Sequence, residues 1–83
     1  MHELKLVKEV AEKALSIAKE NRAKRVKKIF VKIGAGSHLT PENFTHLFQE
    51  FSKNTILEHA KIVISDTKEK GLILESLEVE PFT

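Results

Sequence analysis

The first three residues, Met1, His2 and Glu3, could together form a metal chelate. The Met1 amine, the His2 backbone nitrogen and the His2 imidazole nitrogen can close two small adjacent chelate rings around one ion. A fourth donor could be the backbone nitrogen of Glu3, its carboxylate, or a side chain from elsewhere in the chain. Such a planar, nitrogen-rich donor set favours Ni(II) or Cu(II) over Mg(II) or Ca(II).

Two of these residues also have simpler explanations. The bulky His2 should block removal of Met1 by methionine aminopeptidase, which would keep the amine in place, but a histidine near a terminus can equally be a solvated chain end. Glu3 could lie near the metal, or it could serve only the helix dipole, since an acid in the first turn of a helix is favourable there regardless.

A helix and then a strand follow this end of the chain. From Glu3 to about Asn21, apolar residues recur at helical spacing and Lys and Glu fill the opposite side, which predicts an amphipathic helix. Arg25 to Ile33 alternates between apolar and mostly polar residues, as a half-buried strand does. The glycines after it predict a turn, because no Lys-Ser or Lys-Thr follows to make a phosphate loop.

A second helix should begin at Pro41. Thr40 is a suitable N-cap, and proline is favoured at the first helical position. The helix then carries one strongly apolar stripe formed by Phe44, Leu47, Phe48 and Phe51. His46 falls opposite this stripe and should be solvated. His38, in the preceding loop, could approach the N-terminus if that loop folds back.

The last third of the chain predicts two strands, from Ala60 to Ser65 and from Leu72 to Val79. The polar segment from Asp66 to Gly71 suggests a hairpin connection between them. The element order is therefore α-β-α-β-β, and the predicted fold class is α+β. We expect a two-layer sandwich with two helices on one face of a three-stranded sheet, and a homodimer could form through an exposed edge strand.

Size and composition narrow the function classes. With 83 residues, we expect a single domain whose core is too thin for an enclosed active site, so we do not expect an enzyme. The chain has no cysteine, which excludes disulfides, thiolate zinc sites and cysteine nucleophiles. Neither a membrane-spanning run nor a signal peptide is evident, and the simplest expectation is a cytoplasmic protein without a membrane partner.

Basic residues between Arg22 and Lys28 raise the alternative of a nucleic-acid binder. Alternation along the strand should send Lys27 and Lys28 to opposite faces, which breaks the patch. Acidic residues of the last strand, Glu75, Glu78 and Glu80, could also neutralise it. We therefore expect no nucleic-acid partner.

The chain resembles the HypA or HybF family of nickel-incorporation accessory proteins for hydrogenase and urease maturation. The resemblance rests on Met1-His2-Glu3 opening the first helix, on the strand that ends Lys32-Ile33-Gly34, on Pro41-Glu42 opening the second helix, and on the segment from Ser52 to Ala60. It implies that Ni(II) is bound transiently by Met1, His2 and Glu3, with no catalytic residues. It also implies delivery towards a hydrogenase or urease, alongside a GTPase partner.

One departure from the family is large. Family members carry a zinc domain with two Cys-x-x-Cys pairs between the last two strands, and this chain has no cysteine. We therefore expect residues 1–83 to be a single nickel-binding-type domain without zinc, in which Asp66 to Lys70 bridge the gap. His59 stands where the family usually has glycine, so the resemblance gives it no role. The remaining alternative is a protein-interaction module that keeps the fold but does not deliver nickel.

Overall fold

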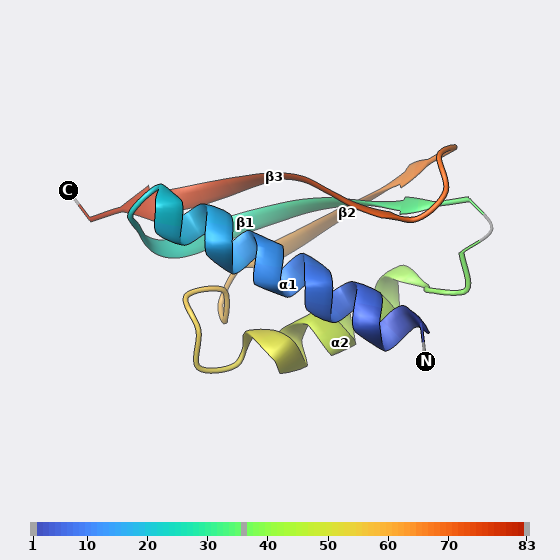
Figure 1. The fold of residues 1–83 in the computed structure, drawn as a ribbon, viewed down its shortest axis with the longest axis horizontal. Coiled ribbons are helices and arrows are strands. Elements are labelled where there is room, and N and C mark those ends of the chain that lie inside the picture. Colours follow the sequence, from blue (N-terminus) through green and yellow to red (C-terminus); the bar gives the residue numbers. More distant parts are fainter. Residues whose placement is uncertain (1, 36, 83) are drawn as a thin grey trace.

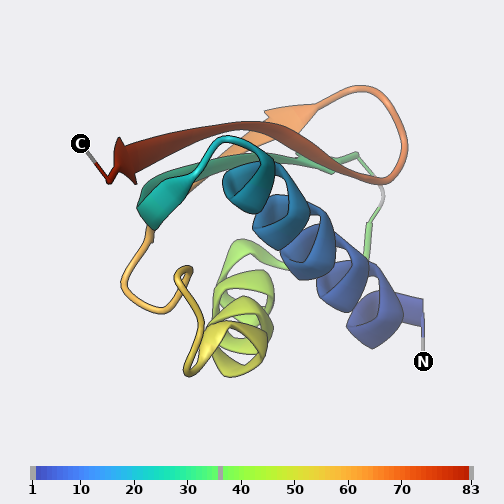
Figure 2. The same ribbon diagram turned by 60° about the vertical axis from the view of Figure 1, so that its left-hand side comes forward.

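The protein folds into two layers, with two helices on one face of a three-stranded sheet (Figures 1 and 2). A computed structural model describes residues 2–35 and 37–82. Along the chain these residues form α1 (His2–Glu20), β1 (Ala23–Gly34), α2 (Pro41–Ser52), β2 (Lys61–Thr67) and β3 (Leu72–Pro81). The predicted α+β class, element order and arrangement of layers are confirmed, and the element ends lie within two residues of those expected.

The sheet has the order β2-β1-β3, so β1 is its central strand. β1 pairs with β2 in parallel and with β3 in the antiparallel direction. The predicted hairpin between β2 and β3 is therefore wrong, because these strands lie on opposite sides of β1. The connection between them crosses the carboxyl end of β1, where the Gly34 N–H donates to the Gly71 carbonyl at 2.7 Å and the Ala35 N–H donates to the Thr67 carbonyl at 2.9 Å.

The core lies between the sheet and the helices. Ile29, Val31 and Ile33 of β1 are buried, as their alternation predicted. Phe44 and Phe48 of α2 are also buried and stack with ring centroids 5.5 Å apart. α1 contributes Val7, Val10 and three small residues, Ala11, Ala14 and Ala18, all buried. Alanines let a helix approach the sheet closely, so α1 can lie along β1 and β3 beside the bulkier α2.

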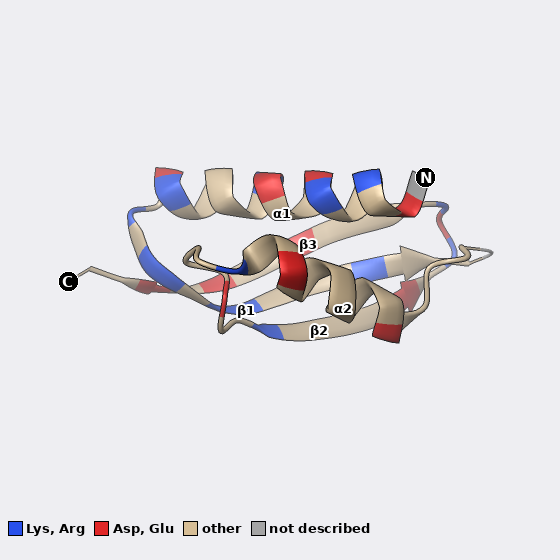
Figure 3. Cartoon of the chain, turned by 90° about the horizontal axis from the view of Figure 1, so that it is seen from below, with Lys and Arg blue, Asp and Glu red and all other residues tan. Residues whose placement is uncertain are grey.

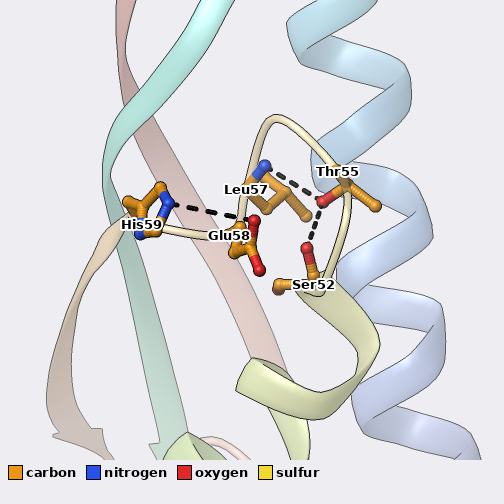
Figure 4. A network of polar contacts seen from close by, with 5 residues as sticks. All are labelled: Ser52, Thr55, Leu57, Glu58 and His59. Atoms are coloured by element: carbon orange, nitrogen blue, oxygen red, sulfur yellow. Dashed lines mark hydrogen bonds and ion pairs between the residues drawn. The ribbon is translucent and has the colours of Figure 1, made fainter.

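Local hydrogen bonds fix both ends of α2. At its start, Thr40 accepts a hydrogen bond from the Asn43 N–H through Oγ1 at 3.1 Å, which confirms the predicted N-cap. At its end, the buried Ser52 hydroxyl donates to the Phe48 carbonyl at 2.7 Å. The Thr55 hydroxyl then donates to the Ser52 carbonyl and accepts from the Leu57 N–H (Figure 4). These bonds turn the chain out of α2 and towards β2.

The starts of α1 and α2 lie at the same end of the molecule (Figure 1). The loop from Ser37 to Thr40 lies there too, because it leads from β1 into α2. The candidate metal-binding end of the chain is thus brought beside residues that are more than thirty positions away in sequence. No helix in the described part of the chain is long and apolar enough to cross a membrane.

Candidate metal centre at the start of α1

The backbone of the candidate site is the first turn of α1, which begins at His2. The N–H groups of a helix's first turn have no carbonyl acceptor within the helix. The backbone nitrogens of His2 and Glu3 can therefore bind a metal without breaking a helical hydrogen bond. Met1 and the side chain of His2 lie outside the described residues, so the predicted roles of the amine and the imidazole stay predictions.

Glu3 is half-buried and faces the space between the two helices and the loop that precedes α2. It lines a cavity of about 270 Å³ with Leu4, His38, Leu39, Asn43, His46 and Leu47. Glu3 and His38 also line a neighbouring cavity of about 430 Å³. The loop before α2 does fold back towards the start of α1, an arrangement that the sequence had left open.

His38 is held by the residues on either side of it. Leu39 is only 5% exposed and anchors the loop in the core. Its N–H donates a hydrogen bond to the Ser37 hydroxyl at 3.1 Å, which restrains the backbone on both sides of His38. The Ser37 N–H in turn donates to the Gly34 carbonyl at 3.2 Å. The backbone around His38 is therefore fixed, and its imidazole remains at the surface.

His46 lies on α2, whose position is set by the buried Phe44 and Phe48 on either side of it. Its predicted exposure to solvent is confirmed. The sequence did not show, however, that His46 shares a cavity with Glu3 and His38. That arrangement depends on how α2 packs against α1, for which the helical pattern of either segment gives no signal.

Among the described residues, no group of three His, Asp or Glu side chains comes together as a metal site. Glu3, His38 and His46 surround one cavity, but by themselves they are not an assembled ligand set.

His59 is far from this region. It belongs to the connection between α2 and β2 (Figure 4). This connection follows the end of α2, whereas α1 and α2 both start at the other end of the molecule (Figure 1). Its side chain is 92% exposed, and its Nε2 lies 3.8 Å from the Glu58 carboxylate. His59 therefore cannot join Glu3, His38 and His46 around one ion.

Two residues of the basic cluster, and Lys32 further along β1, pair with acidic residues of β3. Arg25 pairs with Glu80, Lys28 with Glu78 at 3.9 Å, and Lys32 with Glu75 at 2.8 Å. The hydrogen bond and the attraction to Glu75 raise the pKa of Lys32. Positive and negative side chains therefore face each other at these three positions of the two strands (Figure 3).

Comparison with known proteins shows which family the chain is similar to. A family model described as "Hydrogenase/urease nickel incorporation, metallochaperone, hypA" matches residues 1–72. The chain belongs to the HypA family. The resemblance found in the sequence is thereby confirmed, together with the family's association with nickel and hydrogenase maturation.

Individual HypA proteins show how far the similarity extends. The hydrogenase maturation factor HypA of Methanosarcina barkeri is 32% identical over 80 residues, which cover 96% of this chain and 56% of that protein. HypA of Francisella philomiragia is 42% identical over 67 residues, covering 77% and 56% respectively. This chain thus spans little more than half the length of these HypA relatives.

A solved HypA structure supports the fold. The Ni metallochaperone HypA from Helicobacter pylori superposes with a TM-score of 0.76 at 19% identity, covering 95% of this chain and 97% of that one. At this identity the match concerns the architecture, and it agrees with the two helices and three strands described above.

Proposed function

We propose that residues 1–83 form a nickel-carrier domain that binds Ni(II) through the Met1 amine, the His2 backbone and imidazole nitrogens, and Glu3. The observation that carries this proposal is membership of a nickel-incorporation family in a chain whose first helix begins at His2. Nitrogen donors in a planar arrangement suit Ni(II). The free N–H groups of the first helical turn make the backbone donors accessible.

The position of the site suits an ion that must be passed on. Glu3 borders cavities at the molecular surface, and the neighbouring His38 and His46 are exposed, so another protein can reach a metal bound there. All nitrogen ligands of this kind must lose a proton or remain unprotonated to bind, and affinity should therefore fall on acidification. In this proposal nickel is cargo, and the domain catalyses no reaction.

Family membership also guides the proposed partners. The domain would act in the cytoplasm and pass Ni(II) towards a hydrogenase or urease, together with a GTPase of the maturation machinery. It would do so without zinc, because the chain has no cysteine and the segment after Thr67 leads directly across β1 into β3. We expect the absence of a zinc domain to alter the delivery of nickel to partner proteins and to leave nickel binding itself in place.

Calorimetric titration of Ni(II) into the untagged protein and into His2→Ala tests the proposal. We expect one site in the parent protein and none in the variant, with the same thermal unfolding for both proteins. His59→Ala is the matched control, because it removes an exposed imidazole at the other end of the molecule. Equal binding by the parent and His2→Ala would show that the N-terminus does not hold the ion.

A protein-interaction module without nickel delivery is the second candidate. Leu4 and Leu6 on α1 are 42% and 41% exposed, and such apolar side chains at the surface would suit contact with another protein. If this function is the main one, His2→Ala would leave hydrogenase maturation in cells unchanged, whereas Leu6→Ser would reduce it without changing Ni(II) binding in the calorimeter.

A further inference from the structure

The sheet ends in two free edges, β2 on one side and β3 on the other, because β1 lies between them (Figure 3). On its outer side, each edge strand carries backbone N–H and C=O groups that no other strand of the described chain pairs with. We propose that the β2 edge pairs with the same edge of a second copy of this chain, in the antiparallel direction. The two copies would then share one continuous sheet, and the association would require no metal.

β2 lacks the features that usually protect a sheet edge. Its central residues, Ile62, Val63 and Ile64, are consecutive and β-branched, and neither proline nor glycine interrupts the strand. Protected edges commonly carry a central charge, a proline or a bulge. The charged residues of β2, Lys61 and Asp66, lie towards its two ends, and its register with β1 is unbroken. This edge is therefore suited to accept another strand.

β3 has the protection that β2 lacks. It carries three glutamates, Glu75, Glu78 and Glu80, and no lysine or arginine. Its pairing with β1 shifts register at three places, and irregularities of this kind turn an edge away from a new neighbour. Antiparallel pairing of β3 with its own copy would also bring carboxylates close to carboxylates, which is destabilising. Of the two edges, β2 is the one that fits a second copy.

The face of the sheet away from the helices would gain from this pairing. Ile29 and Val31 are buried in the core on the helix side, so Phe30 between them points to the opposite face. Val63 is the register partner of Phe30 and shares that face. Both side chains are only half-buried. Joining two copies at β2 would place these residues in one apolar row across both sheets and remove part of their surface from water.

The sequence of β2 also selects a register. When Val63 lies opposite Val63 of the second copy, Ile62 lies opposite Ile64, so apolar residues meet at all the central positions. A shift of two residues one way would set Asp66 opposite Ile62, and a shift the other way would set Lys61 opposite Val63. The antiparallel direction also brings the basic start of each strand towards the acidic end of the other.

Cross-linking tests this register directly, because the chain has no cysteine of its own. Val63→Cys introduces a single thiol where the two copies should meet. Opposite Cβ atoms in antiparallel strands lie about 4.5–5.5 Å apart, and a disulfide needs about 3.5–4.5 Å, a difference that small backbone shifts can close. We expect mild oxidation to link this variant into a dimer. Ile73→Cys is the matched control, since Ile73 is also half-buried but belongs to β3, and it should remain largely unlinked.

Charge exchange at the same position tests the association without a covalent bond. In sedimentation equilibrium we expect the parent to associate reversibly as its concentration rises, because a short strand pair is a small interface. Val63→Lys and Val63→Glu should each weaken this association about tenfold or more, since like charges would lie directly opposite. An equimolar mixture of the two variants should associate again, because opposite charges then face each other. Thermal unfolding of each variant confirms that it is folded.

A parent protein that stays monomeric up to millimolar concentration would overturn the inference. Equal linkage of Val63→Cys and Ile73→Cys, or stronger linkage of Ile73→Cys, would also overturn it, because the contact would then not be specific to β2. An association that Val63→Lys leaves unchanged would have the same meaning. None of these results affects the proposed nickel function, which calorimetry tests separately.

Discussion

Gly34→Ala should destabilise the fold by crowding the segment that joins β2 to β3. A Cβ atom at position 34 would lie 2.7 Å from the Gly71 nitrogen and 2.9 Å from the Gly71 oxygen, and closer still to the Glu69 oxygen. All three are backbone atoms, which cannot rotate away as a side chain can. The substitution therefore pushes the connecting segment off the end of β1.

The size of the effect follows from three contributions. Overpacking of this kind costs about 1–3 kcal/mol. Weakening the Gly34 N–H bond to the Gly71 carbonyl costs about a further 1 kcal/mol. Replacing glycine by alanine restricts the unfolded chain and returns about 0.4–1 kcal/mol. The net loss of unfolding free energy is about 1–4 kcal/mol, and each 1 kcal/mol lowers the Tm of a domain this size by about 4–8 °C.

Urea unfolding followed by circular dichroism measures this loss. Gly71→Ala provides a contrast, because a Cβ there meets no atom within 4 Å and its cost comes from a φ of +100°. Inserting two glycines after Lys68 should recover stability in Gly34→Ala, since a longer connection can clear the new methyl group, but not in Gly71→Ala. A Gly34→Ala protein within about 0.5 kcal/mol of the parent would refute the packing of this segment on β1.

Three further predictions concern α2. Phe44→Ala should cost about 3–5 kcal/mol of unfolding free energy, because the ring is fully buried, and a loss below about 1 kcal/mol in urea unfolding would contradict that packing. Thr40→Ala should cost about 1 kcal/mol by removing the N-cap, whereas Thr40→Ser should retain most of it, as the same assay can show. The Lys53 ammonium lowers the pKa of Glu50, so the stabilisation from this pair is present above the unfolded-state pKa of Glu and disappears as the pH falls through the lowered value. NMR titration of Glu50 should show its pKa rise in Lys53→Gln, and an unchanged titration would exclude the pair.

Much of the fold could be predicted because its elements carry strong local signals. The apolar stripe of α1, the Thr40-Pro41 start of α2 and the alternation of β1 each depend on residues close in sequence. The pairing of strands, in contrast, depends on contacts between residues that are far apart in sequence. A short polar connection between two strands usually makes a hairpin. The five residue steps from Thr67 to Leu72 can, however, span about 16 Å. That length exceeds the two strand spacings of about 4.8 Å each that separate β2 from β3 across β1.

Burial favours the arrangement that the structure shows. β1 has the most fully buried strand residues, with Ile29, Val31 and Ile33 all covered, and a central strand is shielded on both edges. β2 and β3 are only half-buried and suit the two edges.

The candidate site was predictable in part for the same reason. His2 and Glu3 are adjacent to the chain start, and their spacing alone suggests a chelate. The approach of His38 and His46 to Glu3 depends on the fold of the loop after β1 and on the packing of α2 against α1. These are contacts between distant segments, and no local pattern encodes them.

The most direct test of the nickel account is to acetylate the Met1 amine selectively and titrate Ni(II) into the acetylated and parent proteins. Acetylation keeps every side chain but turns the terminal amine into an amide without a basic lone pair, so the chelate ring that begins at the amine can no longer form. We predict that the parent binds one Ni(II) and that the acetylated protein loses this site while retaining the same thermal unfolding. Equal affinity and stoichiometry in the two proteins would contradict the N-terminal chelate.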